Sequence, residues 1–161
     1  MKVKWHAIPL ASRKRYCSAF MLVAAMIPLS ASASLGGDME SVQADQADMN
    51  ASQRISEASE NYTVYELQTP TGTTVKEYLS LQGTVFAIVW QGPSLPNLRQ
   101  LMGTYFTQYT EAAKTQHAGH GHLEIQLPDL VVESNGRARA FFGRAYLPKG
   151  LPQGVAATDI Q

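Results

Sequence analysis

Residues 84–90 restrict the possible fold of this chain more than any other segment. They read Thr-Val-Phe-Ala-Ile-Val-Trp, so every position after the threonine is apolar. Because successive side chains of a strand point to opposite faces, a strand with this sequence is apolar on both faces. The segment therefore predicts the central strand of a sheet and places Trp90 in the core.

Two strands are expected before this segment, at residues 62–69 and 73–79. Both are rich in β-branched and aromatic residues, and turn signals that include Gly72 and Gly83 separate the three strands. Short connections join antiparallel neighbours. The three strands are therefore expected to form an antiparallel meander.

An amphipathic helix is predicted after the central strand. Residues 91–94 end the strand, and Ser94 can serve as the helix N-cap. Apolar side chains then recur at helical spacing from about residue 95 to residue 114. They are Leu95, Leu98, Leu101, Met102, Tyr105, Tyr109 and Ala112. We expect one long helix that packs on the meander, with its tyrosines in the core.

Further strands are predicted near the C-terminus. Residues 123–127 alternate between apolar and polar side chains, as a half-buried strand does. Residues 130–134 and 137–142 flank Asn135-Gly136, a dipeptide that favours a two-residue hairpin turn. The last strand is expected to continue to Tyr146, before an extended tail rich in proline and glycine.

The predicted turn determines which side chains of the hairpin share a face. In that register Val131 faces Ala140, and the face that carries Val131 and Phe142 is the better core face. The order of elements favours an α+β fold. We expect an antiparallel sheet, made of a three-stranded meander and C-terminal hairpin strands, packed against one long amphipathic helix.

Charge is distributed unevenly along the chain. Lysine and arginine total 13, as do aspartate and glutamate. Five basic residues lie within the first fifteen positions, whereas every acidic residue lies from Asp38 onward. The remainder therefore has 8 basic and 13 acidic residues and a net charge of −5. Such asymmetry is typical of a targeting segment.

Residues 1–33 match the three parts of a secretory signal peptide. A basic start precedes an uncharged apolar run at residues 19–29, and small residues follow at Ala31 and Ala33. The run contains Pro28 and is shorter than the roughly 20 residues of a membrane-spanning helix. We expect cleavage after Ala33, a periplasmic or secreted protein, and no membrane span in the mature chain.

The mature chain is expected to be one domain with a polar N-terminal extension. In residues 34–61, Asp38 can cap a short helix, and residues 51–61 are typical of a linker. Residues 62–161 form the predicted α+β domain. Cys17, the only cysteine, lies in the segment to be removed, so no disulfide can support the mature fold.

Three histidines follow the predicted helix. His117, His120 and His122 have the spacing H-x-x-H-x-H in a glycine-containing loop. Imidazole binds zinc and copper, but Glu124 is the only nearby carboxylate and the mature chain has no cysteine. A solvated polar loop is the favoured interpretation, and a zinc or copper site is the alternative.

Three of the eight mature basic residues are concentrated at Arg137, Arg139 and Arg144. Together with Phe141 they could hold a carboxylate, a phosphate or a sugar, although exposed charges on strands are also common without a function. A net-negative domain with so short a basic stripe is not expected to bind nucleic acid.

Motifs for catalysis are missing from the sequence. It contains no G-x-S-x-G elbow, no H-E-x-x-H pair and no glycine-rich phosphate loop. Scattered serines, the loop histidines and Asp129 have no spacing that supports a triad. An enzyme is therefore the less favoured interpretation, and no cofactor is expected.

Several parts of the mature chain resemble a known family. They are residues 34–38, 41–45, 62–67 and 143–148, and the run W-x-G-P-x-L-P-x-L-R-Q-L at positions 90–101, which is the most specific. The sequence resembles the bacterial exported family known as domain of unknown function 2844. The resemblance covers nearly the whole mature chain. It implies an exported protein without an assigned activity, so it transfers no catalytic residues.

These features together predict an exported, non-enzymatic module that binds an envelope protein or a small ligand. The joint between Trp90 and Arg99 and the strand with Arg137, Arg139 and Arg144 are the candidate binding surfaces. An extracytoplasmic hydrolase is one alternative, and it requires polar side chains that converge in a pocket. Metal binding by the histidine loop is the other.

Overall fold

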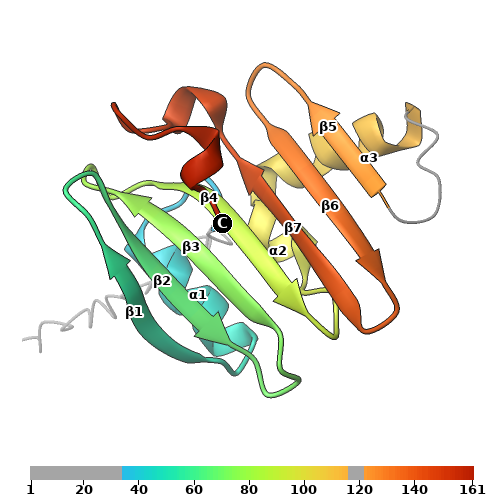
Figure 1. The fold of residues 1–161 in the computed structure, drawn as a ribbon, viewed down its shortest axis with the longest axis horizontal. Coiled ribbons are helices and arrows are strands. Elements are labelled where there is room, and N and C mark those ends of the chain that lie inside the picture. The colour runs from blue at the N-terminus through green and yellow to red at the C-terminus, as the bar shows by residue number, and fades with distance from the viewer. Residues whose placement is uncertain (1–33, 116–121) are drawn as a thin grey trace, which may run out of the picture.

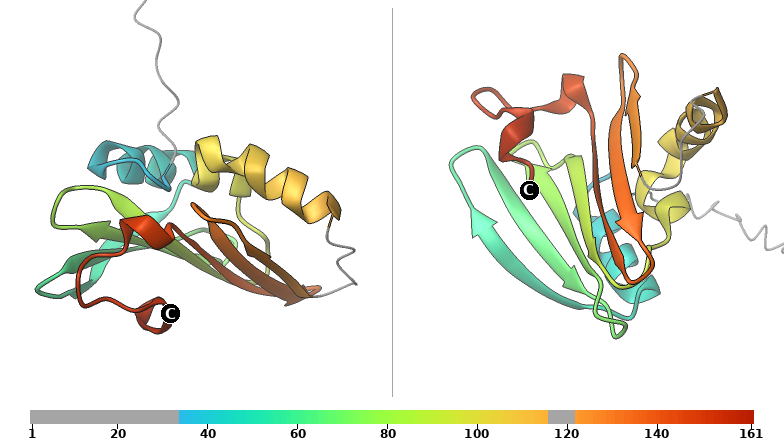
Figure 2. Two further views of the ribbon diagram at one scale, coloured as in Figure 1. Left: turned by 90° about the horizontal axis from the view of Figure 1, so that it is seen from above. Right: turned by 45° about the vertical axis from the view of Figure 1, so that its right-hand side comes forward.

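The computed structural model describes residues 34–115 and 122–161. In this part of the chain, helices cover one face of a seven-stranded antiparallel sheet (Figures 1 and 2). The strands are β1 (Ser52–Ala58), β2 (Tyr62–Gln68), β3 (Thr74–Ser80), β4 (Val85–Gly92), β5 (His122–Gln126), β6 (Val131–Arg137) and β7 (Ala140–Tyr146). The helices are α1 (Met39–Asp48), α2 (Leu98–Met102) and α3 (Phe106–Thr115), with 3-10 turns at Gly103–Tyr105, Pro148–Gly150 and Ala157–Asp159.

The strands lie in the order β1-β2-β3-β4-β7-β6-β5 (Figure 1). The predicted meander is present as β2, β3 and β4. A second meander of β5, β6 and β7 joins it where β7 pairs with β4. The predicted α+β class and antiparallel sheet are confirmed. The sheet is larger than predicted, because both meanders and one additional strand form a single sheet of seven strands.

The additional strand is β1, which lies in the segment predicted to be a linker. It pairs with β2 from Ser52 opposite Gln68 to Ala58 opposite Thr63. Six of its seven residues are exposed, so β1 lacks the alternation of apolar and polar residues that identifies a strand in a sequence. Backbone pairing at the edge of the sheet, rather than burial, therefore defines this strand.

β4 is buried on both faces, as its sequence predicts. Val85, Ile88 and Trp90 belong to the core under the helices, whereas Phe86 and Ala87 belong to a second cluster on the opposite face. The pairing of β4 with β3 is irregular at these residues, and this places the consecutive residues Phe86 and Ala87 on the same face. The prediction that Trp90 lies in the core is confirmed, since its relative exposure is 1%.

The predicted helix at residues 95–114 is present as two helices, α2 and α3, with a 3-10 turn between them. Gly103 ends α2 with φ 48° and ψ −117°, a conformation available to glycine but rarely to other residues. The N-cap is Asn97, whose side chain accepts a hydrogen bond from the backbone N–H of Gln100 at 3.4 Å. Ser94 instead bonds to Thr73 at 2.8 Å. The apolar side of both helices still packs on the sheet.

The two faces of the sheet have different covers. α1, α2 and α3 lie on one face, and the chain after β7 returns across the other (Figure 2, left). This returning segment, residues 151–161, inserts Ile160 at 1% exposure into the cluster of Tyr62, Tyr78 and Phe86. The aromatic rings of that cluster lie 5.7 to 6.0 Å apart. The predicted extended tail is thus a second cover of the sheet.

The hairpin of β6 and β7 is longer than predicted. Asn135 and Gly136 lie inside β6, and the turn is formed by Ala138 and Arg139. Gly136 is opposite Phe141, where a Cβ would lie 2.7 Å from the phenyl ring. Glycine is therefore required here for close approach of the ring and not for a turn, which is why the turn prediction at Asn135-Gly136 is wrong.

The predicted core face of this hairpin is also wrong. Leu130 and Val132 are fully buried under the helices, whereas Phe142 is 53% exposed on the opposite face. Val131 faces Tyr146 and not Ala140. The face under the helices is the one that carries Val132 and Ala145. Gly143 lies on the same face of β7 and leaves room there for the ring of Trp90.

No helix in residues 34–115 or 122–161 is long and apolar enough to cross a membrane.

Gly143 is required where β7 crosses Trp90. The two residues are paired, and a Cβ on Gly143 would lie 2.7 Å from Cε2 of Trp90 and 2.6 Å from the carbonyl oxygen of Glu133. We expect Gly143→Ala to lower the free energy of unfolding by about 1–3 kcal/mol, the usual cost of overpacking. Urea unfolding followed by fluorescence measures this, because Trp90 is the only tryptophan after residue 33.

The matched control is the same substitution in a Trp90→Phe background, followed by circular dichroism. A smaller ring leaves space for the methyl group, so Gly143→Ala should cost less there. An equal cost in both backgrounds would show that contact with the indole ring is not the reason for glycine.

Candidate functional site

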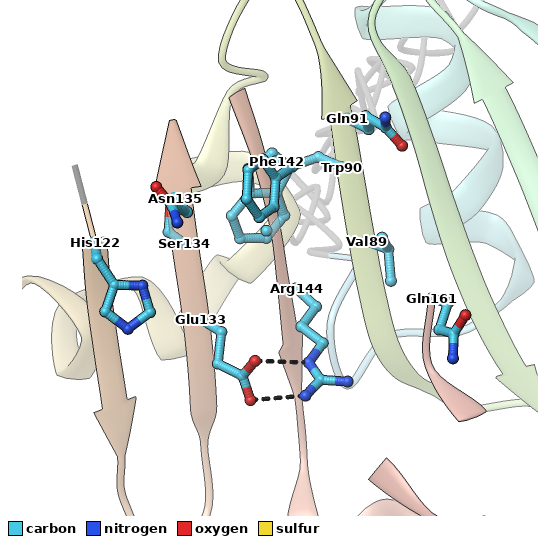
Figure 3. A pocket seen from close by; sticks show the side chains of 11 residues that line it. Val89, Trp90, Gln91, His122, Glu133, Ser134, Asn135, Phe142, Arg144 and Gln161 are labelled. Atoms are coloured by element: carbon cyan, nitrogen blue, oxygen red, sulfur yellow. Dashed lines mark hydrogen bonds and ion pairs between the residues drawn. The ribbon is translucent and has the colours of Figure 1, made fainter. Parts of the chain in front are cut away.

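A pocket of 330 Å³ lies on the sheet face opposite the helices, over β4, β7 and β6 (Figure 3). The side chains around it come from alternate positions of these strands, from His122 at the start of β5, and from Gln161 in the returning segment. They are Val89, Gln91, His122, Glu133, Asn135, Phe142, Arg144 and Gln161. The pocket is open because the returning segment covers the sheet beside it and not over it.

Strand pairing arranges these side chains in two rows. Arg144 lies between Val89 of β4 and Glu133 of β6. Phe142 lies in the next row, between Gln91 and Asn135. Because residues i and i+2 of a strand share a face, both rows point into the pocket.

Arg144 and Glu133 form a bidentate ion pair in the first row (Figure 3). Arg144 Nε donates to Glu133 Oε2 at 3.1 Å, and Nη2 donates to Oε1 at 2.9 Å. Nη1 donates to the carbonyl oxygens of Ala157 and Ile160, at 2.7 and 3.1 Å. The guanidinium therefore holds the returning segment on the sheet, and few of its donors are free for a ligand.

The structure separates Arg144 from the other two predicted arginines. Arg137 is exposed at the end of β6, and Arg139 is exposed in the turn, where its φ is 69°. The three residues are close in sequence, but only Arg144 lines this pocket. They do not form one continuous basic stripe.

Trp90 and Arg99 do not form a shared surface either. Trp90 forms part of the pocket wall, but its side chain is buried among the core residues under the helices. Arg99 is exposed on α2, where its guanidinium lies 4.7 Å from the ring centre of Phe106. This contact stabilises the region where α2 meets α3 and leaves the arginine on the helix side of the sheet.

The predicted histidine cluster is only partly within the described residues. His117 and His120 lie outside them. His122 begins β5, and its Nε2 is 3.8 Å from Glu124 Oε2, with both side chains exposed. Among residues 34–115 and 122–161, no group of three His, Cys, Asp or Glu side chains could hold a metal ion. Metal binding by the loop stays a prediction.

A buried polar cluster under α1 was not predicted from the sequence. Ser34, Asp45 and Glu77 are each 0% exposed. Gln100 Nε2 donates to Asp45 Oδ1 at 2.6 Å, but Ser34 Oγ, Asp45 Oδ2 and both carboxyl oxygens of Glu77 have no hydrogen-bond partner. Burial and the neighbouring Asp45 carboxylate raise the pKa of Glu77 to about 9, and burial also raises the pKa of Asp45.

The sequence does contain a signal for this cluster. Glu77 alternates with Val75 and Leu79, so it lies on the apolar face of β3. Asp45 is three residues after Val42, so both lie on the buried side of α1. A carboxylate at an apolar position of an otherwise regular pattern indicates a buried charge, which needs a partner.

The contacts of Arg144 predict a specific effect of its removal. We expect Arg144→Ala to lower the free energy of unfolding by about 2 kcal/mol, because Glu133 loses a charge-assisted bidentate partner. Amide exchange of residues 155–161 should become faster, since their anchor is lost. Hydrogen exchange with mass spectrometry measures both effects.

Arg137→Ala is the matched control, because it removes an exposed arginine from the same hairpin. Its effect should stay within about 0.5 kcal/mol. Equal effects of the two substitutions would show that Arg144 does not anchor the returning segment.

Comparison with known proteins gives one match. A family model described as "Protein of unknown function (DUF2844)" matches residues 31–160, a span that contains every helix and strand of the structure. No curated protein and no solved structure matches the chain. The resemblance found in the sequence is therefore confirmed, and the chain belongs to the DUF2844 family of proteins of unknown function.

Proposed function

We propose that this protein is exported and acts, without catalysis, as a binding module whose ligand occupies the pocket over β4, β7 and β6. The observation that carries the proposal is the pocket itself, which combines an exposed aromatic ring with polar side chains held by strand pairing. Sites on paired strands keep their geometry without a ligand, as a binding site requires.

The charges around the pocket favour a neutral ligand. Arg144 and Glu133 neutralise each other, and the guanidinium is largely occupied by Glu133 and the returning segment. The other polar groups in its wall include the side-chain amides of Gln91, Asn135 and Gln161. An amide both donates and accepts hydrogen bonds, which suits hydroxyl and amide groups of a ligand.

Phe142 adds an apolar surface to this polar wall. Its side chain is 53% exposed, although most large apolar residues of the sheet are buried. An aromatic ring beside amide groups suits a molecule with one apolar face and several hydroxyl groups, such as a sugar. We therefore propose a neutral carbohydrate as the class of ligand.

Catalysis has less support than binding. Glu133 is held in its ion pair with Arg144, and no hydrogen bond within the described residues joins His122 to a hydroxyl group. Asp45 and Glu77 are fully buried on the helix side of the sheet, where no substrate reaches them. Among residues 34–115 and 122–161, the lining of the pocket offers no base and nucleophile pair of the kind that a hydrolase needs.

Export is supported by the three-part signal in residues 1–33 and by the charge of the remaining chain. Residues 34–161 contain both described cores, from Leu35 to Ile160.

Titration with neutral sugars tests the binding proposal. We expect neutral oligosaccharides to shift the amide NMR signals of β4, β6 and β7 in the chain of residues 34–161. Phe142→Ala should weaken this binding about thirtyfold or more, because an aromatic anchor in a binding site contributes about 2 kcal/mol or more.

Leu81→Ala is the matched control, because Leu81 is a large exposed apolar residue in the turn between β3 and β4. It should leave the affinity unchanged. The proposal fails if neutral sugars produce no shifts, or if acidic sugars bind and neutral ones do not.

Expression of the full-length chain in a Gram-negative bacterium tests export. We expect the protein in the periplasmic or culture fraction, with an intact mass that corresponds to a chain beginning at Ser34. Ala33→Leu should retain the full-length mass, because signal peptidase requires a small residue at this position. A full-length protein that stays in the cytoplasm would contradict export.

A further inference from the structure

We propose that the α-amino group released at Ser34 by signal cleavage becomes the counter-ion of the buried carboxyl groups of Asp45 and Glu77. Removal of residues 1–33 then completes the core under α1. The proposal rests on the export proposed above. It concerns a group that exists only after the peptide bond between Ala33 and Ser34 is broken.

Residues 34–37 are held firmly in place. Leu35 N–H donates to the carbonyl oxygen of Leu101 at 2.8 Å, and Gly36 N–H donates to that of Val85 at 2.8 Å. Val85 N–H donates in return to the carbonyl oxygen of Gly37 at 2.9 Å. These bonds join the start of the described fold to α2 and β4, so Ser34 has a fixed position under the helices.

Ser34 lies at the buried carboxyl groups. Its side chain is close enough to both Asp45 and Glu77 to lower their pKa values, against the larger effect of burial. All three residues are 0% exposed. The α-nitrogen of Ser34 is three covalent bonds from Oγ, so it lies within about 4 Å of that atom.

The cluster lacks a positive charge. No lysine or arginine within the described residues forms an ion pair with Asp45 or Glu77. Asp48 adds a further negative charge near Asp45. Gln100 donates a hydrogen bond to only one of the carboxyl oxygens, Oδ1 of Asp45. Buried carboxyl oxygens without partners are unfavourable unless they are protonated or paired with a cation.

Cleavage supplies such a cation. Signal peptidase adds water across the Ala33–Ser34 bond: the hydroxyl goes to the carbonyl carbon of Ala33, and the nitrogen of Ser34 takes up protons. One amide N–H of the precursor thereby becomes an ammonium group with three donors and a positive charge. The ordinary pKa of an α-amino group is about 7.7–8.0, and two neighbouring carboxylates would raise it against the opposing effect of burial.

The two forms of the chain should respond differently to pH. With an amide at Ser34, Glu77 keeps its proton in the folded state but ionises at its ordinary pKa when unfolded, so stability falls as pH rises from about 4.5 toward 9. With an ammonium group, Glu77 can ionise in the fold. Stability then stays level up to the ordinary pKa of the amine, about 7.7–8.0, and falls as the pH rises from there toward the raised pKa.

The test compares two chains that differ by one residue. One begins at Ser34, and the other retains Ala33, which moves the α-amino group one residue away from the carboxyl groups. We expect the unfolding equilibrium constant of the Ser34 chain at pH 7 to be lower by about tenfold or more, the effect of one pKa unit. Urea unfolding between pH 5 and pH 9 measures the constant and its pH dependence.

Glu77→Gln together with Asp45→Asn supplies the control in both chains. Without the carboxylates, the two chains should have equal stability. If this variant does not fold, labelling of the α-amino group by an acylating reagent at pH 7 gives a second measurement. The reaction should be slow in the Ser34 chain and faster in the chain with Ala33.

The two proposals fail in different ways. Equal stability, equal pH profiles and equal labelling of the two purified chains would overturn the pairing, whatever happens in the cell. An exported protein whose intact mass does not begin at Ser34 would contradict the cleavage site, and with it the pairing in the mature protein. Export to the wrong compartment would affect only the proposed function.

Discussion

The burial of β4 on both faces is the constraint on which the rest of the structure depends. Phe86 and Ala87 on one face, and Val85, Ile88 and Trp90 on the other, are removed from water. A sheet with such a central strand needs a cover on each side. The helices supply one, and the segment after β7 supplies the other. This second cover is narrow, so it leaves the neighbouring part of β6 and β7 open as a pocket.

The sequence predicted the parts of the fold that a regular apolar pattern defines. β4, the meander, the helical segment after it and the strand predicted at residues 123–127, which is β5, all follow such patterns. β1 was missed because its stability comes from backbone pairing at an edge and not from burial. The hairpin turn was misplaced because a glycine can serve either in a tight turn or where a neighbouring side chain packs closely on the backbone. Gly136 has the second role, and only the position of Phe141 on the neighbouring strand reveals it.

The candidate site was less predictable than the fold, because it depends on the register of neighbouring strands. Arg144 was identified as a candidate, but its partners Glu133, Ala157 and Ile160 lie on segments that the predicted register does not bring to it. The pocket wall also depends on Phe142, which the misplaced turn assigned to the core. A site built from three adjacent strands requires their register, and local sequence patterns do not determine register across a sheet.

The charged side chains nearest the pocket pair with each other, and this limits what the pocket offers to a ligand. On the open face Arg144 is neutralised by Glu133, and beneath the helices Asp45 and Glu77 are withdrawn from solvent. The other acidic residues of positions 34–161 contribute surface charge without defining a site. In the proposed function, recognition in the pocket relies on the phenyl ring and on amides, groups that discriminate by shape and hydrogen bonding. The proposed ligand is neutral for this reason, and the proposed site differs in this respect from an anion-binding one.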